Sequence, residues 1–254
     1  MKIVAILQAR MGSSRLPGKM LLPLLDRPLV AQVIERVRRA PNLDMVVLAY
    51  PVADHHIFKP ILNAYLDTAG VPLGAWAQQG DESNLVERYL GAARAYGADL
   101  IVRVPCDNPC IDPAYINVAV EEYLTTPHLW YSNTTAQCGQ VWLDGIGCEI
   151  SSVSRWQWLA ERIAQEPSGI VQALYREHPH QYFYDHDDLS GMIQIDGRFH
   201  HDAVKLDVNT QSEYEKIRDL YAYFGHNRFT SQEIVSYLST QEVSYEEGKH
   251  AAQR

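Results

Sequence analysis

The sequence predicts an α/β fold: a single doubly wound, mainly parallel sheet, with a mixed β flap or subdomain inserted late in the chain. Near-continuous apolar runs such as 2–7 and 45–50 are typical of strands that are covered on both faces. Segments with apolar residues at helical spacing separate these runs, and this alternation indicates a parallel sheet. Near residue 128 the alternation gives way to shorter strand patterns, which predict the inserted region.

The first half of the chain contains strands and helices in regular alternation. Strands are predicted at 2–7, 45–50, 74–79 and 99–105, and helices at 27–39, about 57–68, 84–97 and 112–124. Pro28 suits the first turn of the first helix because its φ angle is fixed near the helical value. Gly97 is a typical stop for the third helix, and Asp112 followed by Pro113 forms a cap and first turn for the fourth.

The second half has a less regular pattern. Short strands are predicted within 129–134, 141–152, 182–185 and 192–195, with a helix at 154–165 and a core strand at 204–208. Two capping boxes, Thr210 with Glu213 and Thr230 with Glu233, begin the closing helices. We expect a single domain over 1–245, with 128–200 as the inserted region and 246–254 as a frayed polar tail.

The N-terminal segment and the whole chain have opposite charge. The formal net charge of −9 argues against nucleic-acid binding through phosphates. The first 25 residues nevertheless contain no acidic residue and carry Lys2, Arg10, Arg15 and Lys19. Such a local cationic site suits a small, highly charged anion such as a nucleoside triphosphate, although solvated surface cations are the alternative.

Other bulk properties exclude several classes. No apolar run approaches the roughly 18 residues that a membrane span needs, so no membrane association is expected. The sequence begins directly with a strand pattern, so no cleavable signal is expected. Four cysteines in 254 residues do not make a disulfide framework, so the reducing cytoplasm is the expected location.

The stretch "ILQARMGSSRLPGKML" (6–21) places cations, glycines and serines directly after the first strand. It is not a Walker A loop, because the glycines are one residue too far apart and Met20 stands where Ser or Thr should bind magnesium. No dinucleotide-binding G-x-G-x-x-G is present either. What remains is a wide loop whose backbone N–H groups can bind phosphates. Its side-chain donors are Arg10, Ser13, Arg15 and Lys19.

Acidic and amide side chains follow two other predicted strands. Asp107 lies just after strand 99–105, at the sheet edge where open α/β proteins bind ligands. Asp207 and Asn209 belong to the last predicted strand, where a period of two places both on one face. Oxygen ligands of this kind suit Mg²⁺, which neutralises phosphate charge during group transfer. A turn-forming role for Asp107 and structural roles for the other two are the alternatives.

"LQARMGSSRLPGKML" resembles the signature of the nucleotidyltransferases that activate acidic sugars as CMP derivatives, the 3-deoxy-manno-octulosonate and N-acylneuraminate cytidylyltransferases. The chain is most similar to their relatives of the spore coat polysaccharide biosynthesis protein F type. The resemblance extends over "GDESNLVERYLGAARAYGADLIVRVPCDNPCIDP", "LDGIGCEI" and "KLDVNTQSEYEKI". It implies a Rossmann-like fold of the nucleotide-diphospho-sugar transferase type.

The resemblance also implies roles for individual residues. The nucleotide-binding set is Gln8, Ala9, Arg10, Gly12, Ser13, Arg15 and Lys19, and the catalytic set is Arg15, Lys19 and Asp107. Glu149 matches the family's acid on the sugar side, and the metal positions are Asp107, Asp207 and Asn209. The family's second metal aspartate falls on Asn209, and a neutral amide is a poorer magnesium ligand than a carboxylate. Region 128–200 is expected to form the sugar side and a homodimer contact.

We therefore expect transfer of CMP from CTP to a sugar or sugar-acid-like acceptor, with Mg²⁺ and release of pyrophosphate. Three alternatives remain at this point: a nucleotide-sugar-dependent glycosyltransferase, guanylyl transfer from GTP, and a catalytically weak nucleotide-binding partner protein. The loop favours a triphosphate over a sugar diphosphate because it contains three cations and a serine. Asn209 is the main argument for a weak catalyst.

Overall fold

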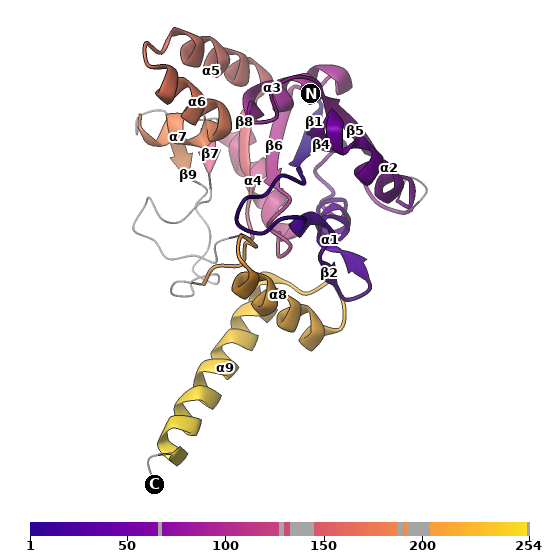
Figure 1. Ribbon diagram of the computed structural model, residues 1–254, viewed down its shortest axis with the longest axis vertical. Helices are drawn as coiled ribbons and strands as arrows, with labels where there is room; N and C mark the ends of the chain where they lie inside the picture. The colour runs from indigo at the N-terminus through magenta and orange to yellow at the C-terminus, as the bar shows by residue number, and fades with distance from the viewer. Residues whose placement is uncertain (66–67, 127–129, 133–144, 187–189, 193–203, 253–254) are drawn as a thin grey trace.

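Seven strands form one sheet in the order β5-β4-β1-β6-β8-β7-β9 in the computed structural model, which describes residues 1–65, 68–126, 130–132, 145–186, 190–192 and 204–252. The strands are β1 (Ile3–Gln8), β4 (Met45–Pro51), β5 (Leu73–Gln78), β6 (Leu100–Pro105), β7 (Trp130–Ser132), β8 (Glu149–Ser152) and β9 (Ser190–Met192). β5, β4, β1 and β6 are parallel, whereas β8 pairs antiparallel with β6 and β7. The predicted mainly parallel α/β fold is confirmed (Figure 1).

The central strands are buried on both faces, as their apolar runs predict. In β1, Ala5 and Leu7 pack into the core on one face of the sheet, whereas Val4 and Ile6 pack into the core on the other face. Successive side chains of a strand point to opposite faces, so a strand between two helical layers needs apolar residues throughout.

Two helical layers cover the sheet. One layer contains α1 (Leu29–Val37), α2 (His55–Asn63), α4 (Pro113–Thr125) and α8 (Gln211–Phe224), and the other contains α3 (Leu85–Tyr96), α5 (Val153–Gln165), α6 (Gly169–Glu177) and α7 (Pro179–Tyr184). In the second layer Trp156 is fully buried and stacks on Tyr89, with ring centroids 4.7 Å apart. The last helix, α9 (Ser231–Ala252), begins against the first layer, where Ile234 is buried in the core, and then projects away from the sheet (Figure 1).

Region 128–200 extends the main sheet rather than forming a sheet of its own in its described part. β8 pairs with β6, and β7 and β9 continue outward from it. One prediction here is wrong: residues 182–185 are not a strand but lie at the end of α7 and just beyond it. The sequence also did not predict α6. Residues 133–144 and 193–203, which include parts of the three strands predicted within 129–134, 141–152 and 192–195, lie outside the described residues.

The predicted core strand at 204–208 is also wrong. Leu206 and Val208 are buried, as the alternation requires, but the segment is not a strand of the sheet. It is instead attached by a hydrogen bond from the Val208 N–H to the Asp107 carbonyl, 2.8 Å long. Among the described residues only Lys205 of this segment takes part in a β bridge, so the alternation reports one buried side of an extended segment rather than a strand of the sheet.

The helix ends follow the predicted signals closely. Thr210 and Glu213 form both hydrogen bonds of a capping box at the start of α8. Gly97 ends α3 in the left-handed conformation, which glycine adopts without steric cost. α2 ends at Asn63, earlier than predicted, and α9 continues to Ala252, so the fraying of the tail stays a prediction. No helix among the described residues is long and apolar enough to cross a membrane.

Candidate active site

A pocket of about 530 Å³ opens at the carboxyl ends of β1 and β6. In the sheet, β4 and β5 lie on one side of β1, whereas β6, which follows them in the chain, lies on the other side of β1. Open α/β sheets bind ligands at such a reversal of strand order. Ten predicted site residues line the pocket: Gln8, Ala9, Arg10, Ser13, Arg15, Lys19, Asp107, Glu149, Asp207 and Asn209. Gly12 does not line it.

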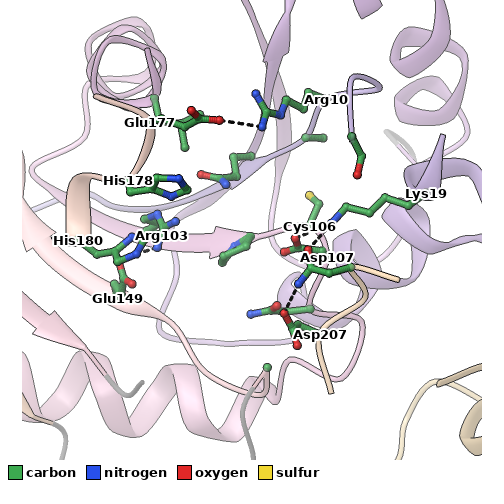
Figure 2. A pocket seen from close by; sticks show the side chains of 18 of the residues that line it. Arg10, Lys19, Arg103, Cys106, Asp107, Glu149, Glu177, His178, His180 and Asp207 are labelled. Carbon is green, nitrogen blue, oxygen red and sulfur yellow. Dashed lines mark hydrogen bonds and ion pairs between the residues drawn. The ribbon is translucent and has the colours of Figure 1, made fainter. Parts of the chain in front are cut away.

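The loop after β1 is fixed at both ends by specific contacts. Near its start the Met11 N–H donates to Asp54 Oδ2 at 2.9 Å. Near its end Gly18 adopts a φ angle of 71°, a left-handed conformation that favours glycine, and begins a short 3-10 helix, η1 (Lys19–Leu21). This turn directs the Lys19 side chain into the pocket (Figure 2).

Lys19 contacts three oxygen atoms from two distant segments, and we call these atoms the Lys19 oxygen cluster. Its Nζ donates to Asp107 Oδ2 at 2.8 Å, to the Val208 carbonyl at 2.8 Å and to Asn209 Oδ1 at 3.0 Å. A lysine ammonium has three hydrogens, so these bonds use all of them. The side chain is only 9% exposed, which makes the cluster a nearly buried cation site.

The segment that carries Asp207 packs tightly against Gly145. Gly145 has a φ angle of 92°, and a Cβ built on it would lie 2.7 Å from the Asp207 nitrogen and 2.9 Å from the Leu206 carbonyl carbon. Only glycine permits this approach of two backbones. Gly145 therefore helps to place the carboxylate of Asp207 in the pocket.

Asn209 connects two cations to one carboxylate. Its Oδ1 accepts a hydrogen bond from Arg15 at 2.9 Å in addition to the one from Lys19, while its Nδ2 donates to Asp207 Oδ2. Its backbone N–H donates to Glu213 Oε2 at 2.8 Å, which attaches the residue to the capping box of α8.

Glu213 remains ionised in this arrangement. Burial opposes its ionisation, but hydrogen bonds from Lys205, the Asn209 N–H and Thr210 more than offset burial and lower the pKa of Glu213 to about 2. Lys205 also lies 3.3 Å from Asp207 Oδ1, so it links the two carboxylates.

The opposite side of the pocket is formed by Glu149, which the resemblance identified, and by residues that the sequence did not identify. Arg103 of β6 forms a buried ion pair with Glu149 of β8, with 2.7 Å between NH1 and Oε2, and the two side chains are 8% and 5% exposed. Beside them burial lowers the pKa of His180 to about 4, so this imidazole is neutral at pH 7. Figure 2 shows these three side chains together, at a distance from Lys19 and Asp107.

A second ion pair joins the loop to α6. Arg10 NH2 lies 3.0 Å from Glu177 Oε1, and both side chains are partly exposed (Figure 2). Glu177 and the neighbouring His178 line the pocket, although no motif marked them in the sequence. Arg103 did leave a signal, because a charged residue inside the apolar run 99–105 needs a buried partner.

Two of the predicted metal positions, Asp107 and Asn209, offer oxygen donors around one cation, the ammonium of Lys19, whereas the third, Asp207, contacts Asn209 and Lys205. Mg²⁺ prefers oxygen donors, so these residues fit such an ion. In this structure the Lys19 ammonium occupies the place between the oxygens. Among the described residues no group of three or more His, Cys, Asp and Glu side chains is gathered as a metal site.

Comparisons with known proteins agree with this geometry. Residues 4–242 match the family model described as cytidylyltransferase. The chain is 27% identical over 247 residues to the spore coat polysaccharide biosynthesis protein SpsF of Bacillus subtilis, covering 93% of this chain and 94% of the relative. It is 35% identical over 129 residues to a 3-deoxy-manno-octulosonate cytidylyltransferase of Trichlorobacter lovleyi, a match that covers 51% of this chain and 48% of the relative.

The solved structure of a cytidylyltransferase from Leptospira borgpetersenii has the same fold, with a TM-score of 0.77, 23% identity and 96% of each chain covered. The family model spans nearly all of the chain, including the loop after β1, Asp107 and Asp207. This chain therefore belongs to the cytidylyltransferase family and is a nucleotidyltransferase.

Proposed function

We propose that this chain transfers the CMP group of CTP to a hydroxyl group of a small, sugar-like acceptor and releases pyrophosphate. One observation carries the proposal: three loop cations and two carboxylates from separate segments line one pocket at the carboxyl edge of the sheet. The family description favours CTP as the donor. The name of the octulosonate relative favours a sugar acid as the acceptor.

In the proposed reaction the acceptor oxygen bonds to the α-phosphorus of CTP and loses its proton to solvent. The bond from that phosphorus to the bridging oxygen breaks, and pyrophosphate leaves with the electron pair. Arg10, Arg15 and Lys19 bind the triphosphate oxygens, since charged hydrogen bonds are about twice as strong as neutral ones. These cations also stabilise the charge that develops on the pyrophosphate.

Asp107 and Asp207 are the residues that would hold Mg²⁺. Bound there, Mg²⁺ supplies neutralisation of the phosphate charge. The two carboxylates come from the end of β6 and from segment 204–208, which packs against Gly145, and both line the pocket. Cations from the loop and carboxylates from two other segments thus meet at one side of the pocket, where the triphosphate would bind.

The acceptor is expected beside Arg103, Glu149 and His180. Glu149 is the residue that the resemblance placed on the sugar side, and its ion pair with Arg103 holds both groups in fixed positions. A fixed donor and acceptor pair is suited to orient a hydroxyl-bearing molecule. Region 128–200 supplies β8 and α6 to this side of the pocket. The proposal also includes a homodimer contact through the same region.

A thermal-shift panel of the four nucleoside triphosphates with Mg²⁺ tests the donor. A ligand present at 100 times its Kd stabilises the native state by about 2.7 kcal/mol, so CTP is expected to raise the Tm most. A larger shift with GTP would instead support guanylyl transfer, and no shift with any triphosphate would contradict the proposal. Pyrophosphate release with CTP and a set of sugar acids and sugar phosphates then tests the acceptor.

A further inference from the structure

Asn209 is the one predicted metal position that is not a carboxylate, and its contacts explain why. Its Oδ1 faces two cations, Lys19 and Arg15, at 3.0 and 2.9 Å. Its Nδ2 faces the carboxylate of Asp207 and donates to it. An amide can accept on one side and donate on the other, whereas an aspartate here would place two carboxylates in contact.

The cation site beside Asn209 is filled by the protein itself. The three hydrogens of the Lys19 ammonium are all bonded within the Lys19 oxygen cluster, and the side chain is nearly buried. A divalent ion and an ammonium cannot occupy one set of oxygens, and two cations this close repel each other strongly. Any ion that uses Asp107 Oδ2 must therefore displace Lys19.

We propose that Asn209 is a positioning residue that keeps Lys19 as the resident cation of the oxygen cluster, so that a divalent cation enters only when Lys19 leaves. Triphosphate oxygens are the natural new partners for Lys19, because they offer several negative charges to a flexible ammonium. The metal then binds together with the nucleotide rather than before it. The order of binding, metal together with nucleotide, rests on the proposed function. The exclusion of a divalent cation by Lys19 in the nucleotide-free protein does not.

The backbone around Asn209 supports this role. Its N–H donates to Glu213 Oε2 at 2.8 Å, and Thr210 caps α8 immediately afterwards. The side chain therefore projects from a fixed point. Asp207 is held separately, by Lys205 on Oδ1 and by Asn209 on Oδ2.

Binding of Mn²⁺ to the nucleotide-free protein, followed by the electron paramagnetic resonance signal of free Mn²⁺, tests the exclusion. Lys19→Met is expected to lower the Kd for Mn²⁺ at least about tenfold, the scale of one charged hydrogen bond removed from the competing cation. Lys205→Met is the matched control, because it removes a lysine that is paired with the other carboxylate, Asp207, and lies outside the cluster. An equal gain in both variants, or none in either, would overturn the proposal.

Asn209→Ala separates positioning from ligation. If Asn209 positions Lys19, this variant loosens Lys19 and frees Asp207 without any change in charge, so Mn²⁺ binds more tightly than to the wild type. If Asn209 were a metal ligand, the same variant would bind Mn²⁺ more weakly, which would refute the inference. Lys19→Gln replaces Lys19→Met if circular dichroism shows that the latter is unfolded.

These experiments are independent of the donor and the acceptor. A protein that no triphosphate stabilises would contradict the proposed function, while a gain of Mn²⁺ affinity in Lys19→Met would still support the exclusion. In the reverse case, CTP raises the Tm while wild type and Lys19→Met bind Mn²⁺ equally, and only the inference about Asn209 is wrong.

Discussion

Asp107 is the single residue on which the proposed metal chemistry depends most. Its carboxylate follows β6 and accepts from Lys19 at 2.8 Å. Asp107→Asn is expected to leave the fold intact and to reduce Mg²⁺-dependent pyrophosphate release by orders of magnitude, because the metal contributes several kcal/mol in the transition state. Asp219→Asn, on the exposed side of α8, is the control and should retain activity. Full turnover by Asp107→Asn and Asp207→Asn alike would refute the two-carboxylate assignment.

His180 makes the stability of the fold depend on pH. Burial lowers its pKa from 6.5 to about 4, so between these values the unfolded chain binds a proton that the folded chain does not. The free energy of unfolding therefore falls as the pH falls from about 6.5 to about 4, by up to about 1.4 kcal/mol per pH unit from this group. In urea unfolding, the free energy of unfolding of His180→Gln should depend less steeply on pH than that of the wild type between about pH 4 and 6.5. Above pH 7 the two proteins should show the same pH dependence. Identical slopes would show that His180 is protonated in the folded state.

At the residue scale the sequence predicted one side of the pocket much better than the other. Arg15, Lys19 and Asp107 could be identified because cations, glycines and an acid directly follow strands, and strand ends share one edge of the sheet. The charge of Arg103 inside an apolar run indicates a buried partner, but neither the identity of that partner nor the place of His180 could be predicted, because both depend on β8 and α7 packing beside β6. Such long-range neighbours leave no local pattern.

At the scale of elements, a substitution of Gly145 tests how the segment 204–208 is kept in its position beside the pocket. A Cβ on Gly145 would lie 2.7 Å from a backbone atom of Asp207, so Gly145→Ala must push that segment away from the pocket. The left-handed conformation adds about 1–2 kcal/mol of strain. We expect a loss of stability together with a large loss of turnover.

Gly225→Ala is the matched control for this element. Gly225 also has a positive φ angle, 66°, but a Cβ on it would meet no atom within 4 Å. It should lose stability through the same backbone strain and keep its turnover. If Gly145→Ala kept full turnover as well, the contact with Asp207 would not position the carboxylate.

Two elements show where sequence patterns are ambiguous. The aromatic residues of 182–185 suit a strand, but the helix begins earlier, at Pro179, which fits a first helical turn. Leu206 and Val208 are buried in alternation, but that pattern records one covered side and not the presence of a neighbouring strand. By contrast the apolar runs of β1, β4 and β6 predicted the central sheet, because only strands between two layers are apolar throughout.

At the scale of the whole molecule, the inserted region continues the sheet and adds α5, α6 and α7 to the layer that contains α3. Its helix α6 brings Glu177 to Arg10, so the insertion and the N-terminal loop share one pocket wall. The same helix has apolar side chains facing solvent: Ile170 is 85% exposed and Leu174 is 44% exposed. Their spacing of four residues places them on one face of the helix.

We expect this face of α6 to contribute to the predicted homodimer contact of region 128–200, because burying exposed apolar surface stabilises association. Ile170→Glu should shift the protein toward monomer in light scattering at a concentration where the wild type is dimeric, since a carboxylate at the centre of an apolar contact loses its hydration without gaining a partner. Val118→Glu is the control, because Val118 is also exposed but lies on α4, outside region 128–200. A wild type that remains monomeric at high concentration would contradict the dimer, and a dimer unaffected by Ile170→Glu would place the contact on another face of the molecule.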